Sequence, residues 1–444
     1  MNFNNTAANL FETVSKNTRI DRLIISSQRT QFGYLVGVLT SGNTLSTAIY
    51  MVGGILMTRL VEPSVLGLFS GIALTLGYAP FLQIGVSNGL SRELPYYIGK
   101  SDRDHAYELA SSAQAWMIFI GGLTALILLM VALYNLIQGD LWLAAGWGAH
   151  VVLVFLLFYS NQYLQTTYRT ANDFARLSMV NVVHALVSLM LLALVWVLDF
   201  YGLCLRAVFT AMIAAGLFHY WRPVRVKPGW NFQHIKHLFF VGAPILFVGQ
   251  AYSCWAVINQ TLVLSYTGAH GMGVYAVVVM ISGSLMLFPQ SLSQVIYPRM
   301  AELFGRGGNI GDLCRMTIKP MLLIVLCMLP LVVAAWWLVG PMIRFFVPKY
   351  VEAVPAVQWA LLQPLIMCFA VINNVFNVIR RQGLYFVAII CGVIVYGFSL
   401  LWLIRGGLSI IIFPQAMLVG HIAFISACYG SLYYLFRRGR SCEK

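Results

Sequence analysis

Amide and hydroxyl side chains occur inside the long apolar runs of this sequence, at matched places in its two halves. Such groups either bond one another across neighbouring membrane helices or line an interior pathway, where they can bind the hydroxyls of a solute such as a sugar. For one residue alone, bonding between helices is the simpler explanation. The matched placement favours a hydrated cavity. The candidates for its lining are Asn43, Thr47, Gln83, Asn88, Gln250, Asn259, Gln290 and Gln294.

Arginines at four positions could bind an anionic group, because a guanidinium matches the geometry of phosphate oxygens. Arg92 and Arg299 close the inner ends of corresponding apolar runs, where an ordinary positive anchor is the simpler explanation. Arg59 and Arg206 stand at predicted outer helix ends, where basic residues are rare, so they are stronger candidates for a functional role. Snorkelling of the side chain to the outer headgroups is the rival explanation for both.

Other polar residues carry less information about chemistry. His150, His184 and His421 fall inside apolar runs without ligand spacing, so buried histidines with satisfied hydrogen bonds are the simpler explanation. Asn373 and Asn377 share one face of a predicted helix, which either packs against a neighbour or lines the cavity.

Several kinds of chemistry lack the residues that they need. The 14 acidic residues all fall outside the predicted mid-membrane positions, which argues against coupling through a buried carboxylate. The eight cysteines show no metal or redox spacing, and the sequence contains no phosphate-binding loop. We therefore expect no metal, no cofactor and no catalytic residues.

The elements that carry these side chains must be membrane helices. Of the 444 residues, 60% are hydrophobic and 9% are charged, and the mean hydropathy is +0.80. A soluble domain carries roughly 25% charged residues, so this chain must face lipid. The apolar runs are unbroken, which excludes the alternating pattern of a barrel. Spans of about 20 residues predict twelve helices, at 33–58, 66–90, 112–137, 141–163, 177–198, 203–221, 238–261, 272–296, 320–339, 354–379, 384–404 and 407–434.

The distribution of basic residues sets the orientation of these helices. With a cytoplasmic N-terminus, all but five of the 28 Lys and Arg residues lie on the inside, as the positive-inside rule requires. The exceptions are Arg59, Arg206, Arg344, Lys349 and Arg405. The net charge of +14 is spread over short loops, so it does not indicate nucleic acid. The sequence predicts a multi-pass protein of an inner membrane with both termini in the cytoplasm.

A faint internal repeat divides the chain into two lobes. Gly67-Leu68-Phe69 and Gly273-Val274-Tyr275 open corresponding spans, and Arg92 and Arg299 close them. The repeat predicts an all-α membrane protein of two six-helix lobes in parallel, related by a pseudo-twofold axis, with a substrate site between them. The predicted parts are a cytoplasmic segment 1–32, an N-lobe 33–221, a cytoplasmic linker 222–237, a C-lobe 238–434 and a cytoplasmic tail 435–444.

Two segments resemble a known transporter family. The run from Arg59 to Phe69, with its Arg, Leu, Pro and Gly-aromatic pattern, is similar to the first extracytoplasmic turn of polysaccharide flippases. The run from Gly85 to Lys100 resembles the segment that follows it in that family. The family is the polysaccharide-transport branch of the multidrug/oligosaccharidyl-lipid/polysaccharide exporter superfamily.

The resemblance implies a function and a substrate. It implies a flippase that moves undecaprenyl-diphosphate-linked oligosaccharide repeat units from the cytoplasmic to the periplasmic leaflet by alternating access. The sugars would enter an O-antigen, a capsule or a related surface polysaccharide of a bacterium. The partners implied are this lipid-linked sugar, membrane lipids and other proteins of polysaccharide assembly. Cationic cavity residues would receive the diphosphate, and Arg59, Arg92, Arg206 and Arg299 are the candidates.

Two other functions are compatible with many membrane spans. A multidrug or small-molecule antiporter of the same superfamily would need a coupling group, for which a buried acidic residue is the expected form. A membrane polymerase or ligase of lipid-linked sugars would display catalytic residues on a large outer loop. The longest predicted outer loop, 340–353, is too short for this.

Overall fold

The computed structural model describes residue 42 and residues 45–306, 309–379 and 381–442. These residues are helical almost throughout, and no strand occurs among them. The prediction of an all-α membrane protein is therefore confirmed. Asn43 and the predicted segment 1–32 lie outside the described residues.

The first half of the chain forms a bundle of antiparallel helices. The turn between its last two predicted spans falls at Asp199, whose φ of 46° interrupts α8. Gly202 lies just after this turn. Glycine is needed there, because a Cβ at this position would lie 2.2 Å from the carbonyl oxygen of Leu194. The elements are an apolar helix Leu45–Leu60, α2 Pro63–Tyr78, η1 Ala79–Gln83, α3 Val86–Gly99, α4 Arg103–Ile137, α5 Leu141–Leu156, η2 Leu157–Leu164, α6 Gln165–Thr170, α7 Phe174–Met190 and α8 Leu192–Tyr220.

The second half forms another bundle. Its longest helical element, α9, contains two predicted spans and is interrupted at Gly268, where a φ of 67° breaks the helix. The elements are α9 Phe232–Gly305, α10 Ile310–Phe346, η3 Pro348–Ala353, α11 Val354–Met367, η4 Cys368–Asn373, α12 Asn374–Val378, α13 Gln382–Ile404 and α14 Ile412–Cys442.

Many of these helices can cross a membrane. Within the described residues, nine helical stretches are long and apolar enough to span, and one of them is the interrupted α9. Two shorter apolar helices, Leu45–Leu60 and Phe174–Met190, fall at further predicted spans. The chain is therefore a multi-pass membrane protein, while the total of twelve crossings stays a prediction.

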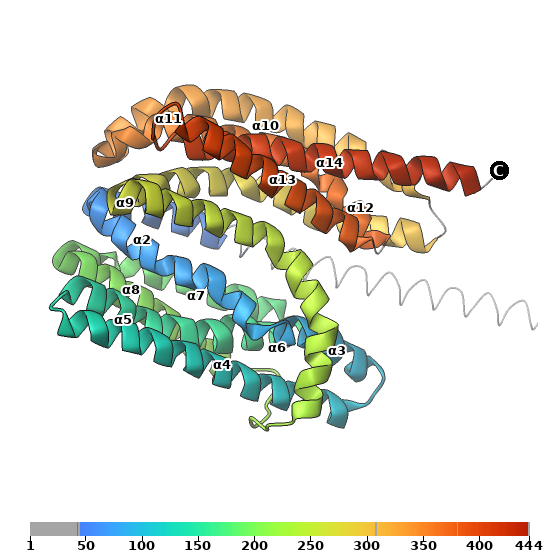
Figure 1. The fold of residues 1–444 in the computed structure, drawn as a ribbon. Helices are drawn as coiled ribbons and strands as arrows, with labels where there is room; N and C mark the ends of the chain where they lie inside the picture. Colours follow the sequence, from blue (N-terminus) through green and yellow to red (C-terminus); the bar gives the residue numbers. More distant parts are fainter. Residues whose placement is uncertain (1–41, 43–44, 307–308, 380, 443–444) are drawn as a thin grey trace, which may run out of the picture.

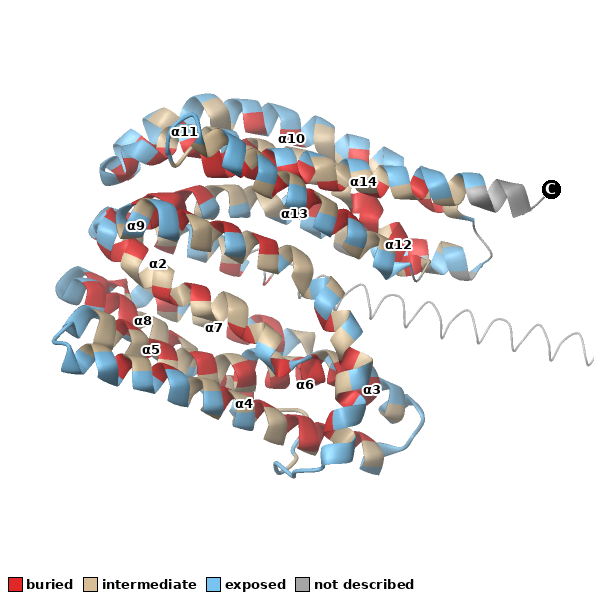
Figure 2. Ribbon diagram, in the orientation of Figure 1, coloured by how far each residue is buried: buried red, intermediate tan, exposed pale blue. Residues whose placement is uncertain are grey.

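The two bundles form two lobes that lie one above the other (Figure 1). The faces turned away from the neighbouring helices are exposed (Figure 2), and they carry many large apolar side chains. On α10, for example, Leu323, Leu326 and Trp337 are 63%, 68% and 76% exposed. Such a surface is stable against lipid and not against water.

The lobes meet where α2 packs against α9. A Cβ on Gly67 would lie 1.6 Å from the carbonyl oxygen of Ala269, and a Cβ on Gly273 would lie 1.7 Å from that of Pro63. Only glycine permits helices to approach so closely. The contact is reciprocal, as a local twofold axis requires. Because the sequence repeat pairs Gly67 with Gly273, this contact agrees with a parallel pseudo-twofold arrangement.

The start of α9 packs on the N-lobe. Ile235 and Leu238 belong to the buried core that α3, α4 and α8 form, and Gly242 lies against the backbone of Gly85. Helix α9 begins at Phe232, so the predicted linker 222–237 includes its first turns. The lobe ranges 33–221 and 238–434 stay predictions, but the first turns of α9 join both lobes physically.

Candidate functional site

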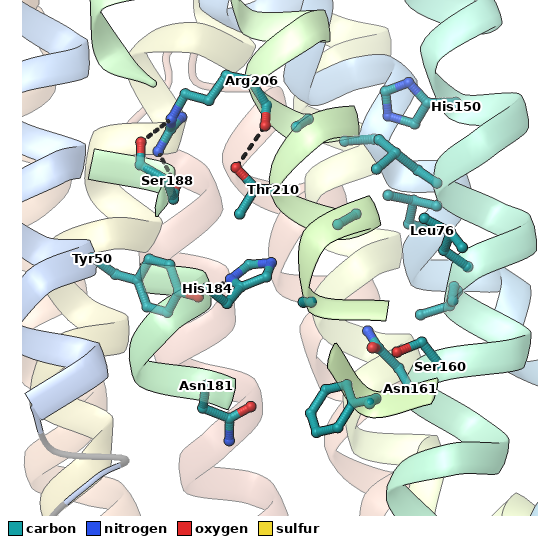
Figure 3. A pocket seen from close by; sticks show the side chains of 18 of the residues that line it. Tyr50, Leu76, His150, Ser160, Asn161, Asn181, His184, Ser188, Arg206 and Thr210 are labelled. Atoms are coloured by element: carbon teal, nitrogen blue, oxygen red, sulfur yellow. Dashed lines mark hydrogen bonds between the residues drawn. The ribbon is translucent and has the colours of Figure 1, made fainter. Parts of the chain in front are cut away.

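A polar cavity of about 450 Å³ lies inside the N-lobe, between α2, α5, η2, α7 and α8. Figure 3 shows Arg206, Ser188 and Thr210 at one end and Asn161 and Asn181 towards the other. The residues that line this cavity include one arginine and no Asp or Glu. The cavity therefore suits an anionic or a neutral polar group better than a cation.

Arg206 supplies the charge of this cavity from α8. Its Nε donates to the backbone oxygen of Ser188 (2.8 Å) and its Nη2 to Ser188 Oγ (2.7 Å). A third contact joins Nη1 to the sulfur of Met57 at 3.1 Å. These bonds hold the guanidinium between the first helix, α7 and α8. A half-buried arginine inside a bundle is costly, and its presence points to a functional role.

Histidines extend the polar wall. His184 on α7 is hydrogen-bonded to Tyr50 Oη on the first helix. His150 on α5 is fully buried, and its Nδ1 donates to the carbonyl oxygen of Gly146 at 2.8 Å. Its Nε2 has no hydrogen-bond partner among the described residues. Both rings line the cavity. The expectation that buried histidines are satisfied is met by His184, but not by His150 or by His421, whose Nδ1 also has no partner among the described residues.

A local break in helical geometry brings further polar groups to the cavity. Residues Leu157–Leu164 form a π-helix between α5 and α6. Ser160 and Asn161, which line the cavity, lie in this stretch. π-Helical turns are rare and recur at functional sites because they redirect side chains.

A second polar cavity, of about 400 Å³, lies in the C-lobe between α9, η4, α12 and α13. Gln290 and Ser293 of α9 face Asn373, Asn374 and Asn377 across it. Asn374 Nδ2 donates to Ser293 Oγ at 2.7 Å. No charged residue lines the cavity. Its amides and hydroxyls can donate to and accept from a neutral polyol.

An adjoining cavity of about 170 Å³ shares Tyr252 with the larger one. Asn259 bridges two tyrosines there. Its Nδ2 donates to Tyr275 Oη (2.7 Å), and its Oδ1 accepts from Tyr396 Oη (2.9 Å). Tyr252 Oη and His421 Nε2 lie 3.1 Å apart. This network fixes the helices that surround the C-lobe cavity.

Corresponding spans of the two lobes are irregular where they line the cavities. In the N-lobe the predicted fourth span contains the π-helix Leu157–Leu164, and in the C-lobe its counterpart contains the 3₁₀ stretch Cys368–Asn373. Irregular backbone within a membrane is tolerated where it lines a cavity, and interruptions at matching positions of two repeats are a strong pointer to a binding site.

The structure places the residues that were predicted to line one cavity at several separate positions. Gln290 and Asn259 line the C-lobe cavities. Gln83 and Asn88 bond to each other at 3.0 Å at the bend between η1 and α3. Gln250 is half-buried and does not line these cavities, and Thr47 is half-buried on the first helix. Asn43 and the side chain of Gln294 lie outside the described residues.

The four arginines that were predicted to bind the diphosphate do not lie together in the structure. Arg206 lines the N-lobe cavity, as a diphosphate-binding role requires. Arg59, Arg92 and Arg299 are exposed. Arg92 Nε lies 3.9 Å from Glu93 Oε1. These residues are not brought together with Arg206 in the N-lobe cavity, and the role of all four stays a prediction.

Several lining residues were not predicted from the sequence. Asn161 and Asn181 of the N-lobe and Asn374 of the C-lobe are examples. The sequence could have indicated these residues only by their position, because each is an amide side chain inside an apolar run. For Asn161 and Asn374, helical spacing does not predict the direction of the side chain, since the π-helix around Asn161 and the 3₁₀ stretch before Asn374 change the rotation per residue.

The fold is similar to that of solved membrane transporters. An inward-facing multidrug resistance MATE family transporter of the MOP superfamily matches with a TM-score of 0.74 and 14% identity, over 90% of this chain and 96% of that one. An outward-facing transporter of that family matches with a TM-score of 0.60 and 17% identity, over 91% and 94%. A MOP superfamily transporter from Pyrococcus furiosus, whose reversed pocket polarity is said to suggest a different function, gives 0.63 and 14%, over 92% and 96%.

A match of the sequence to a family model shows the family of this chain. A family model described as polysaccharide biosynthesis protein matches residues 35–304. The chain therefore belongs to this polysaccharide biosynthesis protein family. No curated protein matches it closely.

Proposed function

We propose that the protein is a flippase for undecaprenyl-diphosphate-linked oligosaccharides, which it moves from the cytoplasmic to the periplasmic leaflet of a bacterial inner membrane. The observation that carries the proposal is the pairing of two polar cavities. One holds Arg206 and no carboxylate, and the other is neutral and rich in amides. A lipid-linked oligosaccharide has the matching parts, an anionic diphosphate and neutral sugars.

The physical problem that such a protein solves is desolvation. Moving a diphosphate and several sugars through hydrocarbon would strip every polar group of water, at about 2–7 kcal/mol for each unpaired one. Polar groups along the path replace that water, while the lipid tail stays in the bilayer. No bond is made or broken, so transport is sufficient and no enzymatic step is needed.

The two cavities divide the recognition. Arg206 and its neighbours at the N-lobe cavity bind the diphosphate through charge-assisted hydrogen bonds. Asn373, Asn374 and Asn377 at the C-lobe cavity bind sugar hydroxyls. Binding across both lobes links substrate occupancy to the relative position of the lobes, which is what alternating access requires. Both termini lie in the cytoplasm on this proposal.

Multidrug export is the second candidate, because the multidrug transporters above share the fold. A carboxylate is the group that would pair directly with the charge of a cationic drug. The residues lining the cavities described above include no carboxylate. This favours the oligosaccharide over a cationic drug. Ion-dependent uptake of cationic dyes into vesicles would support the drug exporter instead.

The test is the fate of lipid-linked sugars in a deletion strain. Radiolabelled sugars are extracted with the lipid, and leaflet-specific probes report which side they occupy. The proposal predicts complete repeat units accumulating on the cytoplasmic leaflet. If complete units reach the periplasmic leaflet and stay unpolymerised, the protein is a polymerase and the proposal is wrong.

A further inference from the structure

A cluster of two histidines and one glutamate lies where α4 meets the first turn of α9. His105 and Glu108 are one turn apart on α4, and His234 comes from α9. Their ligand atoms all lie within 4.8 Å of one another. The cluster is remote in sequence from the residues of both transport cavities. It therefore needs an explanation of its own.

The separations suit one shared cation. Glu108 Oε2 lies 4.0 Å from His105 Nδ1 and 3.8 Å from His234 Nε2. In a tetrahedral zinc site, with bonds of about 2.0–2.1 Å, neighbouring ligand atoms are about 3.3 Å apart. Small side-chain rotations that move each ligand atom by less than about 1 Å would close the difference. The donor set of two imidazoles and one carboxylate is one that zinc uses.

A hydrogen bond sets the orientation of the His234 ring. Ser112 Oγ donates to the backbone oxygen of Glu108 at 2.9 Å, so its lone pairs are free to accept. His234 Nδ1 lies 3.4 Å from Ser112 Oγ, and it donates to this oxygen in the tautomer that is protonated at Nδ1. In the neutral ring, Nε2 then carries a lone pair that faces the Glu108 carboxylate. Two electron-rich atoms placed in this way can share a cation, either a metal ion or a proton on the ring.

The surroundings complete a site at the surface. His105 and His234 pack edge to face with ring centres 5.4 Å apart, and Asp102 accepts from the backbone N–H of His105 at 3.2 Å. A cavity of about 760 Å³ opens beside Glu108 and His234, with Asp104 in its wall. A water molecule from this space can supply a fourth ligand.

We propose that His105, Glu108 and His234 form a binding site for a divalent transition metal, of which Zn²⁺ is the best match. Imidazole and carboxylate ligands suit such ions. The bound ion joins α4, in the N-lobe, to the start of α9, which continues into the C-lobe. Occupancy therefore holds the start of α9 against the N-lobe. The inference does not rest on the identity of the transported substrate.

The test is Zn²⁺ binding by the purified full-length protein, measured by competition with a chromophoric chelator. We expect one equivalent of Zn²⁺ to bind to the wild type. His234→Gln and Glu108→Gln should each weaken binding at least about tenfold, and Ser112→Ala about 10–100-fold through loss of the ring's orienting partner. His270→Gln is the matched control, because His270 also lies within 4 Å of a glutamate, Glu352, but away from the cluster.

Co²⁺ absorption gives a second readout that does not depend on these variants. The bound ion should show the spectrum of nitrogen and oxygen ligands, and His234→Cys should add a thiolate-to-metal charge-transfer band. Thermal melting of the metal-free proteins checks that each variant is folded. Absence of stoichiometric binding to the wild type would overturn the inference. So would binding that His234→Gln leaves unchanged, or thiolate bands in the wild type, which would place the ion at cysteines.

Discussion

Arg206 is the residue on which the transport proposal depends most. Its side chain makes contacts to Ser188 and Met57 that hold it at the wall of the N-lobe cavity. The sequence predicts a role for it only because a basic residue at an outer helix end is unusual. The same reasoning selected Arg59, which is exposed and does not line the cavity. The burial and the direction of the side chain therefore distinguish Arg206 from Arg59, although the positive-inside rule treats both residues alike.

Replacing Arg206 should impair transport more than folding. Arg206→Gln removes the charged donors from the cavity, and hydrogen bonds to charged groups contribute about 1.5–3 kcal/mol, which corresponds to about 10–100-fold in rate. Arg206→Lys keeps the charge and should retain part of the activity. The measurement is the amount of repeat unit on the cytoplasmic leaflet when each variant replaces the native protein. Arg405→Gln is the control, because Arg405 is exposed and is predicted to lie on the outer side. Wild-type levels in Arg206→Gln would remove this residue from the mechanism.

Asn259 should matter for stability in the C-lobe. Asn259→Ala leaves the hydroxyls of Tyr275 and Tyr396 without their shared partner. An unsatisfied buried group costs about 1–3 kcal/mol. We expect a lower melting temperature in detergent. Asn135→Ala, which loses only one bond to its own helix, should melt close to the wild type. Equal melting of both variants would show that the bridge contributes nothing.

At the scale of elements, the proposed alternating access must open the packing of α2 against α9, where the lobes meet. The Gly67–Gly273 contact lies near other contacts between the lobes. Tyr350 Oη donates to the backbone oxygen of Val61 at 3.0 Å, and Lys349 Nζ lies 2.7 Å from Glu62 Oε1. The exposed ion pair adds little, but the tyrosine is fully buried. Alternating access with this end open requires these contacts to part.

Substitutions at this end of the interface between the lobes should shift the protein towards a state in which this end is open. Gly67→Ala places a Cβ against the Ala269 carbonyl, so the close crossing cannot form. Tyr350→Phe is a milder change that removes one hydrogen bond, worth about 0.5–1.5 kcal/mol, or about 2–10-fold in population. Spin labels at Ser64→Cys and Glu352→Cys, in a background without the native cysteines, should report a longer distance in both variants.

A matched control exists on the same helix as Gly273. A Cβ on Gly283 meets no atom within 4 Å, so Gly283→Ala should leave the label distance unchanged. If Gly67→Ala and Tyr350→Phe behave like Gly283→Ala, the crossing at Gly67 and Gly273 does not limit opening.

At the scale of the molecule, sequence and structure agree where hydrophobicity decides the outcome. Charge and glycine breaks predict the turns near Asp199 and Gly268, and the repeat pairs Gly67 with Gly273. Disagreement arises where tertiary packing decides. The first turns of α9 join the N-lobe, and Leu157–Leu164 adopts π-helical geometry, neither of which follows from an apolar run. The direction of each polar side chain depends on such local changes, so the cavities could be predicted only in part.

At the scale of the whole molecule, we propose that this chain alone moves a lipid-linked oligosaccharide across a bilayer. The direct measurement uses purified protein in liposomes that contain undecaprenyl-diphosphate-linked oligosaccharide. An added sugar-cleaving enzyme, which reaches only the outer leaflet, reports movement from the inner one. We expect rapid cleavage of the inner-leaflet pool with the wild type and slow cleavage with Arg206→Gln. Cleavage no faster than in protein-free liposomes, with folded wild-type protein present, would contradict it.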